Sequence, residues 1–259
     1  MIMNIKAGQK IYFASDNHLG APTRKASAKR ERHFVDWLDT IKDNAAAIFL
    51  LGDLFDFWFE YKTVVPKGFT RTLGKLAELS DRGIPIYFFV GNHDMWMNSY
   101  FNEELNIPVY TEPQEFEFNG KHFLIGHGDG LGPGDRGYKF MKKIFTNPIC
   151  KWLFRWLHPD IGVRIAQYFS VKSKLISGDH DVEFNGAENE WLFQYAKDKL
   201  KEKELNYFVF GHRHLPLEIP LNDHSQYINL GDWISYYTYA EFDGEQLTLK
   251  NWKPKSHAV

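Results

Sequence analysis

The chain has 259 residues, of which 44% are hydrophobic and 17% aromatic, so it can bury a substantial core and is not expected to be disordered. Its formal net charge of −2 excludes a general affinity for polyanions, so any attraction to an acidic partner must come from a local basic cluster. A single cysteine, Cys150, excludes an internal disulfide and favours a reducing compartment.

Taken in chain order, short apolar runs alternate with longer stretches of helical periodicity. The runs are rich in Ile, Phe, Tyr and Val with little polar alternation, which is typical of strands buried on both faces. The expected elements are a strand at 10–15, a helix at 26–42, a strand at 46–51, a helix at 70–82, a strand at 85–90, a hairpin at 115–125, a helix at 187–202, strands at 207–210 and 226–230, and a hairpin at 237–252. This order favours a layered α/β fold with a mixed sheet.

The segment 132–178, called the capping segment below, has no strand pattern and is rich in aromatic and basic residues. We expect one domain over 1–259, with this segment inserted as a helical cap or lid. Between Asp135 and Lys174 it holds nine basic and two acidic residues. So small a helical unit has little interior for its many large rings, which predicts an exposed apolar surface rimmed by cations. Such a surface suits an amphiphile with acyl chains and an anionic head. Alternatively, the rings form the segment's own core.

Neither a signal peptide nor a membrane-spanning helix is expected. The first ten residues contain no apolar stretch long enough for a signal peptide, and no run of about 18 uncharged apolar residues occurs. We therefore expect a cytoplasmic protein, for which docking on a membrane surface stays open.

Polar clusters follow five of the apolar runs. The carboxyl ends of strands are where α/β proteins place their sites, so we expect these clusters to meet at one edge of the sheet. The five clusters are Ser15-Asp16-Asn17-His18, Gly52-Asp53-Leu54-Phe55-Asp56, Gly91-Asn92-His93-Asp94, Gly126-His127-Gly128-Asp129 and Gly211-His212-Arg213-His214.

The clusters together offer more metal ligands than one ion can use. Two divalent ions that share a carboxylate can use two aspartates, one asparagine and four histidines. This mixture suits Mn²⁺, Fe or Zn²⁺ better than Mg²⁺ or Ca²⁺, and the absence of thiolates argues against a structural zinc site. Each motif alone has a plain structural explanation, such as a turn. The five in one order predict paired metal ions, the usual arrangement for in-line displacement at phosphorus.

These motifs resemble the signature of the calcineurin-like metallophosphoesterases, which implies a four-layer αββα sandwich and a metal-dependent phosphoric ester or pyrophosphate hydrolase. The resemblance implies that Asp16, His18 and His214 hold one metal ion, that Asn92, His127 and His212 hold the other, and that Asp53 bridges them. His93, Asp53 and Asp94 are the implied catalytic group, with His93 near the scissile phosphate. Asp56 and Asp94 are also expected to orient histidine side chains.

A closer resemblance, covering about residues 10–252, is to the bacterial UDP-2,3-diacylglucosamine pyrophosphatases of lipid A and lipopolysaccharide biosynthesis. It is carried by the first two clusters, by His127-Gly128-Asp129 with Gly137-Tyr138, and by Leu230-Gly231-Asp232-Trp233. It implies cleavage of UDP-2,3-diacylglucosamine to UMP and 2,3-diacylglucosamine 1-phosphate, two Mn²⁺ ions, and peripheral contact with the cytoplasmic face of the inner membrane. Candidate substrate contacts are Asn92, His93, Tyr138, Arg164, Lys172, Ser173 and Lys174. One departure is His93, where the best-known members carry arginine, and this leaves the exact substrate open.

Three other hypotheses compete with this one. A phosphatase or phosphodiesterase for a soluble substrate such as a nucleotide would leave the capping segment merely structural. A binding module on a phosphoesterase scaffold would be expected to lose metal ligands, which this sequence keeps. A nuclease would be expected to place stacking rings along a charged groove, but the run from Trp152 to Leu157 is too apolar, so no nucleic acid partner is expected.

Overall fold

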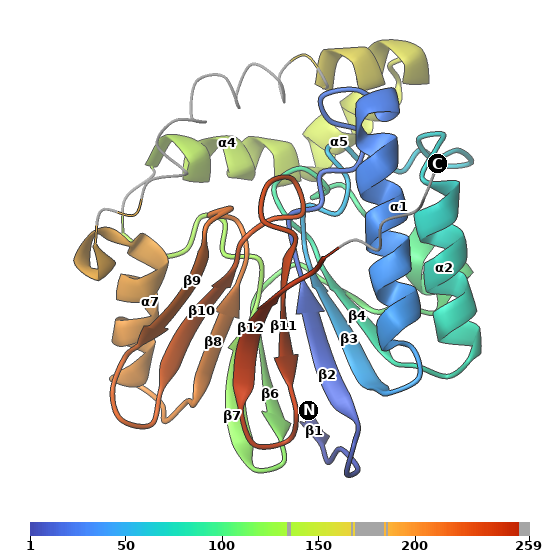
Figure 1. Ribbon diagram of the computed structural model, residues 1–259. Coiled ribbons are helices and arrows are strands. Elements are labelled where there is room, and N and C mark those ends of the chain that lie inside the picture. The colour runs from blue at the N-terminus through green and yellow to red at the C-terminus, as the bar shows by residue number, and fades with distance from the viewer. Residues whose placement is uncertain (134–135, 167, 169–183, 185, 254–259) are drawn as a thin grey trace.

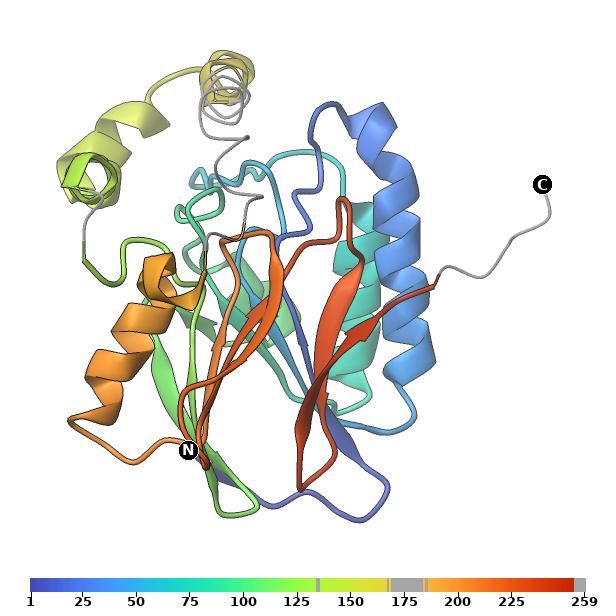
Figure 2. The same cartoon turned by 60° about the vertical axis from the view of Figure 1, so that its left-hand side comes forward.

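The computed structural model describes residues 1–133, 136–166, 168, 184 and 186–253. Two six-stranded sheets face each other, and helices cover the outer face of each, which makes four layers (Figures 1 and 2). One sheet has the order β1(Ile2–Met3), β6(Gln114–Phe118), β7(Lys121–Ile125), β8(Tyr207–Phe210), β10(Gln226–Leu230), β9(Pro216–Pro220). The other has the order β12(Leu247–Asn251), β11(Thr238–Phe242), β2(Lys10–Ala14), β3(Ala45–Leu51), β4(Ile86–Phe89), β5(Val109–Tyr110). The expected four-layer fold is thereby confirmed, while the single mixed sheet expected from the residue pattern is replaced by two sheets.

The central strands are apolar throughout because both of their faces are covered. Along β2, Ile11 and Phe13 belong to the core between the sheets, whereas Tyr12 and Ala14 pack under the helices. Between the sheets, the ring of Phe13 lies 6.2 Å from that of Phe123 on the facing sheet. This double burial is the physical reason for the apolar runs in the sequence.

Helices form both outer layers and continue over one end of the sandwich. The helices α1 (Arg24–Ile41) and α2 (Thr70–Asp81) cover one sheet, and α7 (Trp191–Leu200) covers the other (Figure 1). The Thr23 side chain caps α1 by accepting a hydrogen bond from the backbone N–H of Ala26. The described part of the capping segment is also helical, with α4 (Arg136–Thr146), α5 (Pro148–Arg155) and a helical stretch at 159–166. These capping helices lie above the ends of the sheets (Figures 1 and 2).

Two features of the helices differ from expectation. The helix expected at 187–202 is divided, because the short 3-10 helix η1 (Ala187–Asn189) is followed by Glu190 in an extended conformation and only then by α7. The short helix α3 (Tyr100–Leu105) was not expected.

In the part of the chain that the structure describes, no helix is both long and apolar enough to cross a bilayer. The expected end of the capping segment near residue 178 falls outside the described residues.

Candidate metal centre

The five polar clusters meet at one end of the sandwich because the strands before them run in parallel. In one sheet β2, β3 and β4 are parallel, and in the other β7 and β8 are parallel. The two sheets are joined at this end: Asp16 accepts a hydrogen bond of 3.0 Å from the backbone N–H of His212. The sites expected from each strand end are therefore brought together across two sheets.

Backbone strain is concentrated at this centre. Nine non-glycine residues in the described ranges have positive φ, and five of them are expected metal ligands. Left-handed backbone is costly for residues other than glycine and persists only where the surroundings fix it. The five are Asp16, His18, Asp53, His212 and His214. Close packing adds to this, since a Cβ on Gly211 would lie 1.9 Å from Ser15 Oγ, so only glycine fits there.

One group of ligands gathers around Asp16. The Nε2 atoms of His18 and His214 lie 3.1 Å apart, and Asp16 Oδ1 lies 3.4 Å from the Nε2 of His214. Asp16 Oδ2 is occupied by the N–H of His212 and the hydroxyl of Ser15. Asp16 Oδ1 is buried and has no hydrogen-bond partner among the described residues, so it is left to face the two imidazoles.

A second group gathers around Asn92. Its Oδ1 lies 3.2 Å from His127 Nε2 and 3.0 Å from His212 Nδ1. Asp53 lies between the groups, because its Oδ2 is 3.5 Å from both His18 Nε2 and His127 Nε2. Its other oxygen, Oδ1, accepts the backbone N–H of His93 at 2.8 Å. The structure thus brings all seven expected ligands together and places Asp53 where a shared carboxylate would lie.

Oxygen atoms of the chain lie beside the Nδ1 atoms of three histidines, whose Nε2 atoms face the centre. His127 Nδ1 lies 2.7 Å from the carbonyl oxygen of Leu51, and a carbonyl can only accept, so this nitrogen carries the proton. His18 Nδ1 lies 3.4 Å from Asp56 Oδ1, and His214 Nδ1 lies 3.4 Å from Asp232 Oδ2. Outer partners of this kind fix the tautomer and leave the Nε2 lone pair available for a metal ion.

The pKa values report a strongly negative centre. Burial opposes ionisation of Asp16, but the charge on His214, together with the nearby His18 imidazole at 3.8 Å, outweighs it and lowers the pKa of Asp16 to about 2. Burial also disfavours the imidazolium of His127, yet the charge of Asp53 raises the pKa of His127 to about 10. Burial, together with the charge of His127, lowers the pKa of His212 to about 4. The charge of Asp53 that holds the proton on His127 would attract a divalent cation in the same way.

The donor set fits divalent metal ions. Ligands about 2.1 Å from one ion lie about 3.0–3.4 Å from each other in octahedral or tetrahedral arrangements, and the distances between ligand atoms here fall in or near that range. Carboxylate, amide and imidazole donors together match first-row divalent ions. Asp16, His18, Asp53 and His214 could hold one ion, with Asn92, His127 and His212 beside Asp53 for a second.

Asp94 corrects one expectation. Its carboxylate is fully buried and accepts hydrogen bonds from the backbone N–H groups of Gly91, Leu54 and, at longer distances, Asp53 and Phe55. Burial and the charge of Asp53 raise the pKa of Asp94 to about 7. Asp94 therefore joins the loops after β3 and β4 through backbone N–H groups, where a histidine partner was expected.

His93 and Asp56 lie beside the centre. His93 Nδ1 is 3.0 Å from the carbonyl oxygen of Asp56 and 3.7 Å from its carboxylate. The carbonyl requires a proton on Nδ1. The side chain of His93 is 14% exposed, whereas those of His18 and Asp53 are almost fully buried. His93 is thus a partly open imidazole at the rim.

The expected substrate contacts are placed less uniformly. The Tyr138 hydroxyl donates to Asp129, and its ring lies 6.3 Å from that of His212. Arg164 is exposed on the stretch 159–166. Lys172, Ser173 and Lys174 fall outside the described residues.

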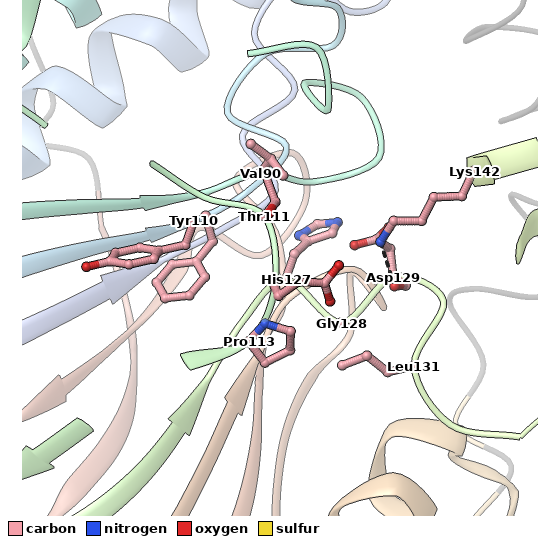
Figure 3. Close-up of a pocket in the computed structure, with 11 residues that line it drawn as sticks. Val90, Tyr110, Thr111, Pro113, His127, Gly128, Asp129, Leu131 and Lys142 are labelled. Atoms are coloured by element: carbon pink, nitrogen blue, oxygen red, sulfur yellow. Dashed lines mark hydrogen bonds and ion pairs between the residues drawn. The ribbon is translucent and has the colours of Figure 1, made fainter. Parts of the chain in front are cut away.

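Lys142 reaches from α4 to Asp129 at 2.7 Å, close to His127 (Figure 3). The cavity lined there by His127, Asp129 and Lys142 is about 10 Å³, which is room for one water molecule and excludes a substrate.

The capping helices expose an unusually apolar surface. Thirteen large apolar side chains among the described residues between 140 and 184 are exposed, and the exposure of Trp156 reaches 75%. They are Phe140, Met141, Ile144, Phe145, Ile149, Trp152, Leu153, Trp156, Leu157, Ile161, Ile165, Tyr168 and Phe184. The expectation that the rings form a closed core of the segment is wrong for these residues. An exposed apolar patch of this kind marks an interaction site.

Reasoning from sequence assigned no role to three residues that support the centre. Asp232, which follows β10 as Asp53 follows β3, accepts three backbone N–H groups and lies beside His214. Its position after a strand and a glycine was a usable signal. Arg213 and Glu190 form a buried ion pair, and no sequence pattern joins two residues so far apart in the chain.

Comparisons with known proteins agree with this geometry. The sequence model described as "Calcineurin-like phosphoesterase" matches residues 9–216. A UDP-2,3-diacylglucosamine hydrolase of Porphyromonas gingivalis is 41% identical over 255 residues, covering 93% of this chain and 97% of the relative. A protein of the same name from Actinobacillus succinogenes is 28% identical over 224 residues, covering 86% of this chain and 92% of the relative.

Solved structures are more distantly similar. A phosphoesterase from E. coli aligns with a TM-score of 0.46 at 16% identity, covering 92% of this chain and 91% of the other. A dimetal phosphatase from Danio rerio aligns with a TM-score of 0.47 at 13% identity, covering 95% of this chain and 96% of the other.

Proposed function

The chain belongs to the calcineurin-like phosphoesterase family, and on this premise we propose that it hydrolyses the pyrophosphate of UDP-2,3-diacylglucosamine, releasing UMP and 2,3-diacylglucosamine 1-phosphate. The proposed place of this reaction is lipid A biosynthesis. The observation that carries the proposal is the combination of a candidate centre for two divalent cations at one end of the sandwich with exposed apolar side chains on the capping helices, which lie above the ends of the sheets (Figure 1). The substrate joins a pyrophosphate to two acyl chains, so it needs both.

The relatives support the choice of substrate. The Porphyromonas gingivalis hydrolase is similar along nearly its whole length. Its name gives the substrate, and the site and the capping helices of this chain are chemically suited to the same molecule.

The ions proposed are two Mn²⁺. When bound, they would supply the Lewis acidity that activates water and offsets charge on the phosphoryl oxygens. Asp53 would hold both ions in register, since its Oδ2 is equally distant from one histidine of each group. The Leu51 carbonyl and the Asp56 and Asp232 carboxylates would keep the imidazoles turned toward the ions.

His93 is proposed to act on the phosphate itself. Its Nδ1 proton is held by the Asp56 carbonyl, so Nε2 is the nitrogen left for the substrate. As an imidazolium, His93 would donate a hydrogen bond from Nε2 to a phosphoryl or leaving oxygen. Its partly open position at the rim fits that role better than the burial of the ligands does.

The capping helices are proposed to hold the acyl chains and to contact the membrane that supplies them. Their exposed apolar side chains would be costly in water and are suited to a lipid environment. Basic residues on the same helices, among them Lys143, Lys151 and Arg155, would attract anionic headgroups. We therefore propose peripheral docking at the cytoplasmic face of the inner membrane.

A substrate panel under saturating Mn²⁺ tests the proposal. The panel contains UDP-2,3-diacylglucosamine, the same sugar nucleotide without acyl chains, free nucleotides and bis(p-nitrophenyl) phosphate. We expect UMP release from the diacylated substrate with a kcat/KM at least 100-fold above that for the deacylated one. An Asp53→Ala variant serves as the control for a contaminating activity.

Two results would count against the proposal. Absence of UMP release from the diacylated substrate would exclude the assigned reaction. Equal kcat/KM with and without the acyl chains would favour the alternative of a soluble nucleotide or phosphoester substrate, with capping helices that have no role in recognition.

A further inference from the structure

A buried ion pair lies directly behind the candidate metal centre. Arg213 stands between the ligands His212 and His214 in the chain, and its guanidinium contacts the carboxylate of Glu190. Two parallel hydrogen bonds join them, from Nε to Oε2 and from Nη2 to Oε1, both of 2.8 Å. The residues are only 4% and 2% exposed. The pair is a bidentate ion pair shielded from water.

The geometry of the pair restricts it to an arginine and a carboxylate. Two parallel N–H···O bonds need the planar fork of guanidinium, which lysine lacks. The ring of Trp191 also covers the guanidinium, at 4.9 Å from its centroid. Such a pair brings little net stability compared with packed apolar residues, because both charges must be desolvated. Its burial therefore calls for a role other than stability.

That role lies in the backbone of the ligand loop. His212 and His214 both have positive φ, at 70° and 53°, so the loop is held in a conformation that these residues disfavour. Arg213, the residue between them, is fixed at its far end by Glu190. A fixed middle residue sets the directions in which the two flanking imidazoles leave the loop. One imidazole faces the Asn92 group and the other the Asp16 group.

The same anchor lies beside the start of the capping segment. Glu190 is the N-cap of α7, and Trp191 is its first residue. The Trp191 ring lies edge-on to His212, with 6.4 Å between the centroids. A Cβ on Gly132, where the capping segment begins, would lie 2.6 Å from the Trp191 carbonyl oxygen, so the start of the segment packs against the first residue of α7.

We propose that the Arg213–Glu190 pair is a positioning device that sets the His212 and His214 imidazoles for metal binding and fixes them to the base of the capping segment. The inference rests on the proposed function in one respect, since it takes these histidines as metal ligands. Arg213 and Glu190 act through those ligands and do not touch the substrate. Loss of the Arg213–Glu190 pair would weaken the binding of both metal ions, because the loop supplies one ligand to each group.

Apolar replacement of the whole pair separates positioning from stability. Arg213→Met alone leaves a buried carboxylate without its partner and is expected to unfold the loop. The double variant Glu190→Met with Arg213→Met removes both charges, so its metal-free Tm should stay near or above that of the wild type. Glu188→Gln is the matched control, because Glu188 lies two residues away and pairs with Lys197 at the surface. Arg213→Lys keeps the positive charge but cannot form the two parallel hydrogen bonds to Glu190.

Mn²⁺ affinity is the primary measurement, by electron paramagnetic resonance of the free ion in the absence of substrate. We expect the double variant to bind Mn²⁺ about 10- to 100-fold more weakly, as for other losses of an outer partner of metal ligands. Arg213→Lys should give a smaller loss, and Glu188→Gln none. With bis(p-nitrophenyl) phosphate at saturating Mn²⁺, kcat should fall in the double variant while KM stays within about twofold.

The possible outcomes distinguish the two proposals. If the wild type binds fewer than two Mn²⁺ ions, the dinuclear centre itself is wrong. If the wild type binds two and the folded double variant binds them with unchanged affinity, the positioning role is overturned. If the double variant does not fold, Arg213→Lys decides the question. A Mn²⁺ affinity of Arg213→Lys equal to that of the wild type would then overturn the positioning role.

Discussion

Trp96 connects the capping helices to the loop that carries Asn92 and His93, and Trp96→Ala tests whether that connection serves the acyl chains. Its indole N–H donates a 2.7 Å hydrogen bond to the carbonyl oxygen of Phe145. Its ring contacts Phe145 and Phe154 of the capping helices, with centroids 5.7 and 4.8 Å away. On the other side it contacts Phe57 and Phe59, which follow the Asp53 cluster.

The loss of docking free energy can be estimated from these contacts. Each ring pair contributes about 0.5–1.5 kcal/mol and the hydrogen bond about 1 kcal/mol. The contacts that reach the capping helices therefore amount to about 2–4 kcal/mol. Because about 1.4 kcal/mol corresponds to a factor of ten, the docked fraction would fall by roughly 30- to 1,000-fold relative to the undocked one. Trp96→Phe keeps an aromatic ring and loses the hydrogen bond, so its effect should be near fivefold.

Two substrates measured in parallel show the effect. For Trp96→Ala we expect KM for UDP-2,3-diacylglucosamine to rise at least tenfold. With bis(p-nitrophenyl) phosphate, which has no acyl chains, kcat/KM should change less than threefold. Thermal unfolding of the metal-loaded variant controls for global damage.

Either of two results would refute the reasoning. An unchanged KM for the diacylated substrate would mean that docking of the capping helices does not govern its binding. A parallel loss of activity on both substrates would mean that Trp96 supports the metal centre instead.

Three further predictions concern the centre itself. Asp53→Ala should lower kcat at least 100-fold, because it removes the shared carboxylate, and retention of a tenth of the wild-type rate would rule out that role. Asp94→Asn should destabilise the metal-free protein by about 3 kcal/mol in urea unfolding, since an amide nitrogen cannot accept the backbone N–H groups; a change below about 1 kcal/mol would contradict this. Mn²⁺ at 100 times Kd should stabilise the chain by about 2.7 kcal/mol per site and raise Tm by about 10 °C, a gain that a chelator reverses; no shift of Tm would contradict the presence of the site.

Much of the centre could be predicted from the sequence because strand ends and ligands coincide along the chain. Each buried strand is a recognisable apolar run, and the ligands follow it within a few residues, as Asp16 and His18 follow β2. The parallel direction of such strands then brings the ends together. What the pattern could not show is that the runs belong to two sheets, since pairing partners depend on contacts between distant segments.

The features that were missed depend on tertiary contacts. Glu190 interrupts the helix expected at 187–202 because its carboxylate is drawn inward to Arg213, which local propensity does not register. β9 escaped notice because prolines stand at both of its ends and Glu218 at its centre, which suits only an edge strand. Asp94 was assigned to a histidine although its contacts are backbone N–H groups of two loops, and those loops meet only in the fold.

Counting the Mn²⁺ ions bound per chain at equilibrium tests the central claim most directly. A titration of metal-free protein, with free Mn²⁺ followed by electron paramagnetic resonance, should saturate at two ions per chain for the wild type and at one or fewer for Asp53→Ala. The claim of a dinuclear centre would be contradicted if the wild type saturated at one ion. It would also be contradicted by the absence of binding at Mn²⁺ concentrations up to 1,000 times those that support catalysis in the same buffer.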